Sequence, residues 1–109
     1  MKKLSPPHPG KILKEEFLEP LSITQYRLAK DIDVPAIRIS EILHGKRIIS
    51  ANTALRLGKY FGTSPEFWLN LQNHYDIKKE SKKISKILRI KVKIFHTKAD
   101  SGFFSKKNW

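Results

Sequence analysis

The amino-acid sequence predicts an all-α protein of five helices that include a helix-turn-helix, with a short C-terminal strand as an addition. Residues 24–45 contain two helical patterns separated by a four-residue break. Apolar residues recur at helical spacing on both sides of this segment, and residues typical of helix starts and stops bracket each pattern. Residues 88–95, by contrast, alternate apolar and polar side chains as a half-buried strand does.

The first helix is expected over residues 9–20, after a proline-rich extended start. Pro9 suits the first turn of a helix, and Pro20 ends the pattern. One side carries the apolar residues Ile12, Leu13 and Phe17. The outer edge carries three carboxylates, which form either a solvated face or a docking surface for a basic partner: Glu15, Glu16 and Glu19.

The helix-turn-helix is expected over residues 24–45. Thr24 can cap the first of its helices, whose apolar face comprises Leu28, Ala29 and Ile32. In the break, Asp33 can adopt a left-handed conformation and Pro35 suits the first turn of the next helix. The second helix turns its apolar stripe to the core, and Gly45 stops it. That stripe consists of Ile39, Ile42 and Leu43.

The opposite side of the second helix, residues 35–44, is the candidate binding surface. At about 100° per residue, four side chains line up away from the core: Ile37, Ser40, Glu41 and His44. Ala36 and Arg38 flank this stripe. Two cations, Lys46 and Arg47, directly follow the helix, where they could reach phosphates without carrying sequence information.

A fourth helix is expected from the N-cap Ser50 to the stop at Gly62, and a fifth from the N-cap Ser64. Gly58, in the middle of the fourth helix, suggests a close crossing of another helix. The fifth helix carries a heavy aromatic and apolar face, which is typical of a core or a subunit interface: Phe67, Trp68, Leu71 and Tyr75.

Residues 1–76 are expected to form the helix-turn-helix domain and residues 77–109 a basic extension. In the extension, the strand pattern at residues 88–95 would need a partner, because one strand is not stable alone. The same strand of a second copy would serve most economically, which makes the chain a homodimer. The competing interpretation is one long basic amphipathic helix from residue 64 to about 95. The aromatic residues Phe103, Phe104 and Trp109 would need cover if ordered.

Charge points to a polyanionic partner. The chain carries a formal net charge of +12, of which +4 falls on residues 1–73 and +8 on residues 74–109. Nucleic acid is the first candidate and anionic lipid the second, while plain solvation of the tail remains the simpler alternative. With no cysteine, no signal-like start and no long apolar run, the chain is expected in the cytoplasm without a membrane span.

Catalysis is not expected. The sequence has no glycine-rich phosphate loop, no nucleophile motif and no histidine or carboxylate spacing suited to a metal. We therefore expect no cofactor and no metal site.

The chain resembles the HigA antitoxin family of phage-repressor-like, or Xre-type, helix-turn-helix proteins. The resemblance covers about residues 8–76 and rests on the runs HPGKILKEEFLEP (8–20), TQYRLAK (24–30), RISEILHGKR (38–47) and NTALRLGKYFGTSPEFWLNLQ (52–72). It implies a bacterial antitoxin that dimerises on an inverted-repeat operator in its own promoter and represses the operon. It further implies a toxin partner of the HigB type, a small RelE-like ribonuclease that cuts messenger RNA.

The same resemblance implies roles for individual residues. Gln25 would contact a phosphate, and His44, Lys46 and Arg47 would hold the DNA backbone. Base edges would face Ala36, Ile37, Arg38 and Ser40, with Glu41 on the same side of the helix.

Two positions depart from the family pattern. Asp33 stands where the family usually has glycine in the turn, and Ile37 stands where a small polar residue is common. Ile37 either packs on a thymine methyl or marks a site that no longer reads DNA. Two alternatives to the antitoxin therefore stay open: a stand-alone Xre-family repressor without a toxin, and a protein-interaction module without DNA recognition.

Overall fold

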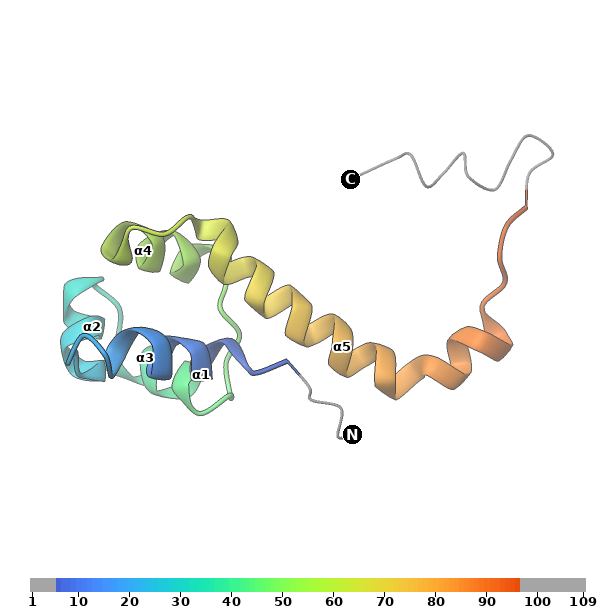
Figure 1. Ribbon diagram of the computed structural model, residues 1–109, viewed down its shortest axis with the longest axis horizontal. Coiled ribbons are helices and arrows are strands. Elements are labelled where there is room, and N and C mark those ends of the chain that lie inside the picture. The colour runs from blue at the N-terminus through green and yellow to red at the C-terminus, as the bar shows by residue number, and fades with distance from the viewer. Residues whose placement is uncertain (1–5, 97–109) are drawn as a thin grey trace. The chain divides into compact units, whose positions relative to one another are not determined.

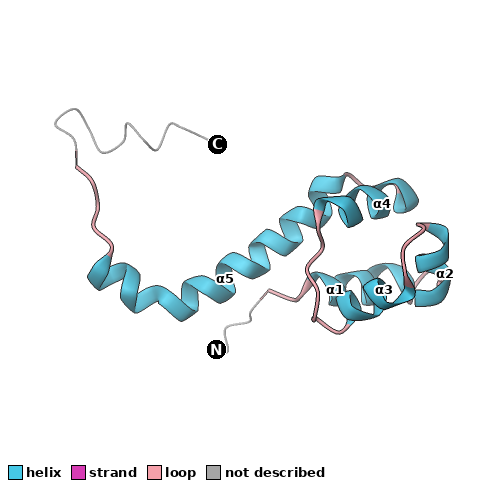
Figure 2. Cartoon of the chain, turned by 180° about the vertical axis from the view of Figure 1, so that it is seen from behind, coloured by secondary structure: helices cyan, strands magenta, loops and turns pink. Residues whose placement is uncertain are grey.

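The computed structural model describes residues 6–96, in which all regular secondary structure is helical (Figures 1 and 2). Within this range the first helix consists of an α-helical turn, α1 (Pro9–Ile12), continued by the π-helix η1 (Leu13–Leu18). Four helices follow: α2 (Gln25–Asp31), α3 (Ala36–Leu43), α4 (Ala51–Phe61) and α5 (Pro65–Lys91). The predicted all-α class is confirmed. The predicted C-terminal residues Phe103, Phe104 and Trp109 lie outside the described residues.

The helix starts form as the sequence predicts. The hydroxyl of Thr24 accepts from the Arg27 amide at 3.1 Å, that of Ser50 from the Thr53 amide at 3.3 Å, and that of Ser64 from the Phe67 amide at 3.1 Å. Each bond satisfies one of the amides that a helix start leaves without a partner. One detail differs, because Pro35 is the N-cap of α3 and not its first helical residue.

One hydrophobic core joins the helices of the first unit, Met1–Lys79. Every helix up to the start of α5 contributes to it, and the connection before α4 adds Ile49. Its fully buried members include Leu13, Leu28, Ile39, Ile42, Ile49, Leu57 and Trp68. The aromatic face predicted for the fifth helix is thus partly core, since Trp68 is buried and its indole N–H donates to the Thr63 hydroxyl at 2.8 Å.

Gly58 is explained by a close approach, although not by a helix crossing. A Cβ at this position would lie 2.7 Å from the Thr63 carbonyl oxygen and 3.3 Å from the Pro65 nitrogen. The connection between α4 and α5 therefore folds back onto α4 where Gly58 leaves room.

The strand predicted over residues 88–95 does not form in the described part of the chain. Instead α5 runs on to Lys91, with a local break at Ile84 (φ −111°, ψ 15°), and residues 92–96 have no regular structure. A helix satisfies its backbone hydrogen bonds within the segment, whereas a strand needs a neighbouring strand. The competing prediction, one long basic helix from residue 64 to about 95, is therefore closer to the structure than the strand. The second unit, Glu80–Trp109, begins inside α5.

Candidate nucleic-acid interface

The turn of the helix-turn-helix is closed by backbone hydrogen bonds around Asp33. Asp33 adopts the left-handed conformation (φ 59°) predicted for it. Its amide donates to the Lys30 carbonyl at 3.2 Å, and the Val34 amide donates to the Ala29 carbonyl at 3.0 Å. This pair of bonds is the Schellman motif, which usually has glycine at the left-handed position. Aspartate tolerates that conformation, so the turn keeps its geometry at a small cost.

The end of α3 repeats the same motif at Gly45. Gly45 has φ 72°, its amide donates to Ile42 at 3.1 Å, and the Lys46 amide donates to Glu41 at 2.8 Å. Both ends of α3 are thus set by defined turns. The helix is a rigid element on which side chains can be placed with precision.

The side chains predicted to face DNA lie on α3 or directly beside it, with different exposures. Ile37 is 59% exposed, and His44 is exposed as well. Arg38, Ser40 and Glu41 are half-buried. Ala36 is half-buried and packs against the core, so only part of it is available to a partner.

The two cations after α3 have different surroundings. Arg47 forms an ion pair with Glu41, with 2.7 Å between Nη2 and Oε1, and its Nε donates to the same oxygen at 2.8 Å. The side chain of Lys46 is exposed and forms no hydrogen bond or ion pair within residues 6–96. An exposed ion pair contributes little to stability, so Arg47 can exchange Glu41 for a phosphate at small cost.

Two residues that the sequence did not single out tie α4 to the helix-turn-helix. The side-chain oxygen of Asn52 accepts from the Nη1 of Arg38 at 3.2 Å and from the Nε of Arg56 at 2.8 Å. Arg56 Nη1 also donates to the carbonyls of Ile32 and Asp33, at 2.7 and 3.0 Å. The bond between Arg56 and Asn52 is local, four positions apart on α4. The bonds that reach the helix-turn-helix join positions 14 to 24 apart in the chain, so no local pattern predicts them.

A second tie joins α4 to α2. The hydroxyl of Tyr60 donates to the carboxylate of Asp31 at 2.6 Å, and the Nε of Arg27 donates to the same oxygen at 3.3 Å. The hydrogen bond from Tyr60 lowers the pKa of the Asp31 carboxyl below its ordinary value and raises the pKa of the Tyr60 hydroxyl. Side chains of α4 therefore hydrogen-bond to the end of α2 and to the start of α3, on both sides of the turn.

The start of α1 supports α3 from the other side. A Cβ on Gly10 would lie 1.9 Å from the carbonyl oxygen of Ile42, a distance that no side chain could occupy. His8 caps α1, because its Nδ1 accepts from the Gly10 amide at 2.9 Å, and its ring packs edge-on against Tyr75 with 5.0 Å between centroids. The segment HPG thus sets how closely α1 approaches the end of α3.

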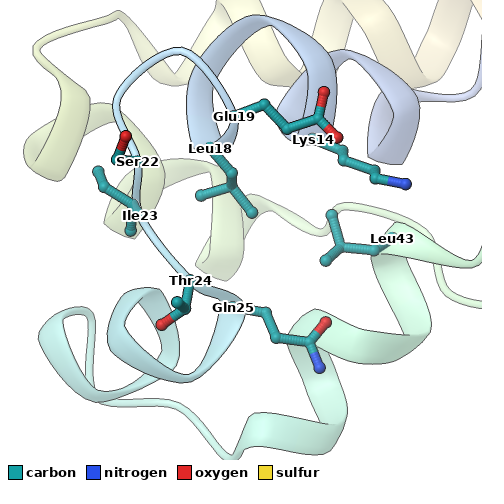
Figure 3. A pocket seen from close by; sticks show the side chains of 8 residues that line it. All are labelled: Lys14, Leu18, Glu19, Ser22, Ile23, Thr24, Gln25 and Leu43. Atoms are coloured by element: carbon teal, nitrogen blue, oxygen red, sulfur yellow. The ribbon is translucent and has the colours of Figure 1, made fainter.

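Gln25, the predicted phosphate contact, stands at the edge of a shallow cavity of about 410 Å³. Figure 3 shows it extending from the start of α2 towards α3, with Leu43 beside it. The remaining lining comes from the end of the first helix and the loop before α2: Lys14, Leu18, Glu19, Ser22, Ile23 and Thr24. Gln25 is half-buried, so its amide is held near the surface of the helix-turn-helix.

The described residues contain neither a candidate membrane-spanning helix nor a candidate metal site. No helix within residues 6–96 is long and apolar enough to cross a membrane. In the same range no three histidine or carboxylate side chains lie where they could hold a metal ion together.

Comparison with known proteins places this geometry among helix-turn-helix proteins. The family model described as Helix-turn-helix matches residues 14–68, half of the chain. Virulence-associated protein I of Dichelobacter nodosus is 49% identical over 71 residues, which is 65% of this chain and 66% of that protein. The match thus spans just under two thirds of that relative.

Two solved structures extend the similarity to the fold. An addiction module antidote protein of the HigA family from Coxiella burnetii has a TM-score of 0.80 and 48% identity, covering 84% of this chain and 100% of that one. The Pseudomonas aeruginosa antitoxin HigA, solved with the higBA promoter, has a TM-score of 0.80 and 37% identity, covering 84% and 99% of the two chains.

Proposed function

The chain belongs to the Helix-turn-helix family and, within it, to the HigA-type antitoxins, and from this premise we propose that it is a DNA-binding antitoxin. In this proposal a homodimer binds an inverted-repeat operator in its own promoter and represses the operon. The same protein neutralises a HigB/RelE-like toxin that cleaves messenger RNA. The similarity to an antitoxin solved together with promoter DNA supports the DNA-binding part.

The observation that carries the proposal is the outward side of α3. A large apolar side chain, Ile37, is 59% exposed next to the half-buried guanidinium of Arg38, on a helix fixed at both ends. At this position on the outward side of α3, the exposed side chain of Ile37 is available to an apolar partner. A thymine methyl group in the major groove is an apolar partner of suitable size.

The candidate residues divide into base contacts and phosphate contacts according to the chemistry of their side chains. Arg38 and Ser40 can hydrogen-bond to base edges, and Ile37 can contact a thymine methyl. Phosphate contacts would come from side chains at the margin of this surface: Gln25, His44, Lys46 and Arg47. Ala36 and Glu41 lie beside the base-reading side chains. Two copies of α3 would enter successive major grooves about 34 Å apart, which predicts half-sites one helical turn apart.

A footprint of the purified protein on the DNA upstream of its own gene tests DNA binding. We expect protection of an inverted repeat with that spacing. Arg38→Ala and Ile37→Ser should each reduce the preference for operator over random DNA by about tenfold, since one good base contact discriminates by roughly 1–3 kcal/mol. If the wild-type protein protects nothing specific, only the protein-interaction alternative remains.

The toxin part of the proposal assigns the acidic edge of the first helix as the docking surface. Glu15, Glu16 and Glu19 are all exposed, and none forms an ion pair within residues 6–96. In an otherwise basic chain, these carboxylates suit a basic partner.

Co-expression with the neighbouring gene tests this assignment. We expect a small basic protein of about a hundred residues to co-purify, and the triple change Glu15→Lys, Glu16→Lys, Glu19→Lys to release it. Glu66→Lys, at an exposed site on α5, is the charge-reversal control. Operator binding without any co-purifying protein would instead support a stand-alone Xre-family repressor.

A further inference from the structure

Two guanidinium groups from different helices meet at one neutral oxygen. Asn52, in the first turn of α4, accepts from Arg38 of α3 at 3.2 Å and from Arg56 of α4 at 2.8 Å through the same Oδ1 atom. All three side chains lie at the surface or half-buried, so burial is not what brings them together. Two guanidinium cations repel each other, and the shared acceptor on Asn52 offsets part of that repulsion.

The position of this oxygen is tied to the turn of the helix-turn-helix. Arg56 uses its Nε for Asn52 and its Nη1 for the carbonyls of Ile32 and Asp33, at 2.7 and 3.0 Å. A guanidinium is planar and rigid, so these bonds fix the Asn52 oxygen relative to the turn. The turn, Arg56, Asn52 and Arg38 form a continuous chain of hydrogen bonds, which we call the arginine bracket.

Arg38 is the most weakly held member of the arginine bracket. Its bond to Asn52 is the longest of the four, and the remaining N–H groups of its guanidinium have no partner within residues 6–96. The side chain is thus held at one nitrogen while its other donors stay available. A long side chain loses conformational freedom when it is ordered on binding, and a side chain already held in place avoids part of this cost.

We propose that Asn52 is a positioning residue for base recognition, which presents the Arg38 guanidinium to the major groove in a fixed orientation. The inference rests on the proposed operator binding and adds a residue outside the recognition helix to the determinants of specificity. Arg56 anchors Asn52, and Asn52 orients Arg38.

The choice of asparagine over aspartate fits this role. A carboxylate would bind both guanidinium groups more strongly. It would also put a negative charge on the surface that approaches the DNA phosphates and weaken the attraction on which all DNA binding depends. The neutral amide holds Arg38 without that charge.

Binding measurements on the full chain test the proposal. The affinities for operator and for random DNA are compared in the wild type, Asn52→Ala, Arg38→Ala and the double variant. Asn52→Ala should reduce the operator preference by about 3- to 10-fold while changing the affinity for random DNA by less than about twofold. The double variant should match Arg38→Ala, because Asn52 acts through Arg38. Asn73→Ala, the same change at an exposed site on α5, should leave both affinities unchanged.

Equal loss on operator and random DNA would overturn the proposal, because Asn52 would then be a plain phosphate contact. Additive losses in the double variant would overturn it as well. Asn52→Asp keeps the acceptor oxygen, so it should retain the operator preference while binding both DNAs more weakly. Loss of preference in this variant would count against the role of the oxygen.

NMR relaxation of the arginine side chains provides a test that needs no DNA. The Nε–H group of Arg38 should become more mobile in Asn52→Ala and remain unchanged in Asn73→Ala. Unchanged mobility of Arg38 refutes the arginine bracket even if operator binding is found. A mobile Arg38 without any operator preference in the wild type refutes the proposed function, and the specificity role of Asn52 with it.

Discussion

At the scale of single residues, His8 and Gly10 show how a short segment at the start of α1 sets the packing of α1 against the end of α3. His8 accepts the amide of Gly10, which requires an unprotonated Nδ1. Burial lowers the pKa of His8 below its ordinary value of 6.5; the carboxylate of Asp76 opposes this shift and the cation of Lys79 adds to it. The neutral imidazole is therefore the form that the folded chain favours.

This predicts a pH dependence with a definite sign. A depressed pKa in the folded state means that the unfolded chain takes up the proton first as the pH falls. The contribution of His8 should be present above about pH 6.5 and be lost as the pH falls through its lower folded-state pKa. His8→Asn keeps a good N-cap that does not titrate, so its free energy of unfolding should fall less between about pH 7.5 and 5. Urea titrations at each pH measure this, and identical pH profiles would contradict it.

Gly10 predicts a steric effect. In Gly10→Ala the new Cβ would lie 1.9 Å from the Ile42 carbonyl oxygen, so α1 must move away from α3. Overpacking of this kind typically costs about 1–3 kcal/mol, and we expect at least that loss in urea unfolding. Lys11→Ala, at the exposed neighbouring site, should change stability by less than about 0.5 kcal/mol.

At the scale of elements, a buried glutamine joins α5 to the connection before α4. Gln72 is 4% exposed; its Oε1 accepts from the amide of Ile49 at 2.8 Å, and its Nε2 donates to Asp76 at 3.0 Å. The amide of Ile49, in this connection, thus has its partner on α5. Helical periodicity places Gln72, one turn after Trp68, on the core side, but no local pattern identifies its partner Ile49.

Gln72→Leu removes the acceptor and leaves the Ile49 amide without it. An unpaired buried donor costs about 1–3 kcal/mol, which should appear as a loss in the free energy of unfolding. The matched control is Asn73→Leu, at the exposed adjacent position, where we expect little change. If the two variants lose the same stability, the hydrogen bond to Ile49 contributes nothing.

At the scale of the whole molecule, the exposed apolar surface suggests where a homodimer forms. In the first unit Trp68 is fully buried in the core, whereas 37% of the surface of Phe67 is exposed. In the second unit large apolar side chains remain outside: Ile87 (53%), Ile90 (59%), Val92 (55%) and Ile94 (74%). Within the described residues there is no strand to support the predicted dimer contact by strand pairing. We propose instead that the exposed apolar side chains of residues 87–94 form the dimer contact.

Light scattering tests the dimer on the full chain. The wild type should be a dimer, and the double variant Leu88→Glu, Ile90→Glu should shift it towards monomer, because each change puts a charge into an apolar contact. Ser81→Glu, Ser85→Glu adds the same charge to exposed polar sites of the same helix and should leave the dimer intact. An unchanged dimer in the first variant would place the contact elsewhere.

The sequence by itself determined where three of the helices start and how the turn between α2 and α3 is closed. The caps at Thr24, Ser50 and Ser64, and the left-handed turn at Asp33, depend on atoms within a few residues of each other, so local pattern is sufficient. The base-reading stripe on α3 follows from helical periodicity, and its contacts with DNA stay a prediction.

The tertiary structure decided what local pattern could not. The bond from Arg38 to Asn52 joins positions 14 apart, and that from Ile49 to Gln72 joins positions 23 apart. Which of these polar groups meet depends on how the helices pack. The end of α5 is a similar case, since the alternating pattern of residues 88–95 is compatible with a strand only if another strand pairs with it.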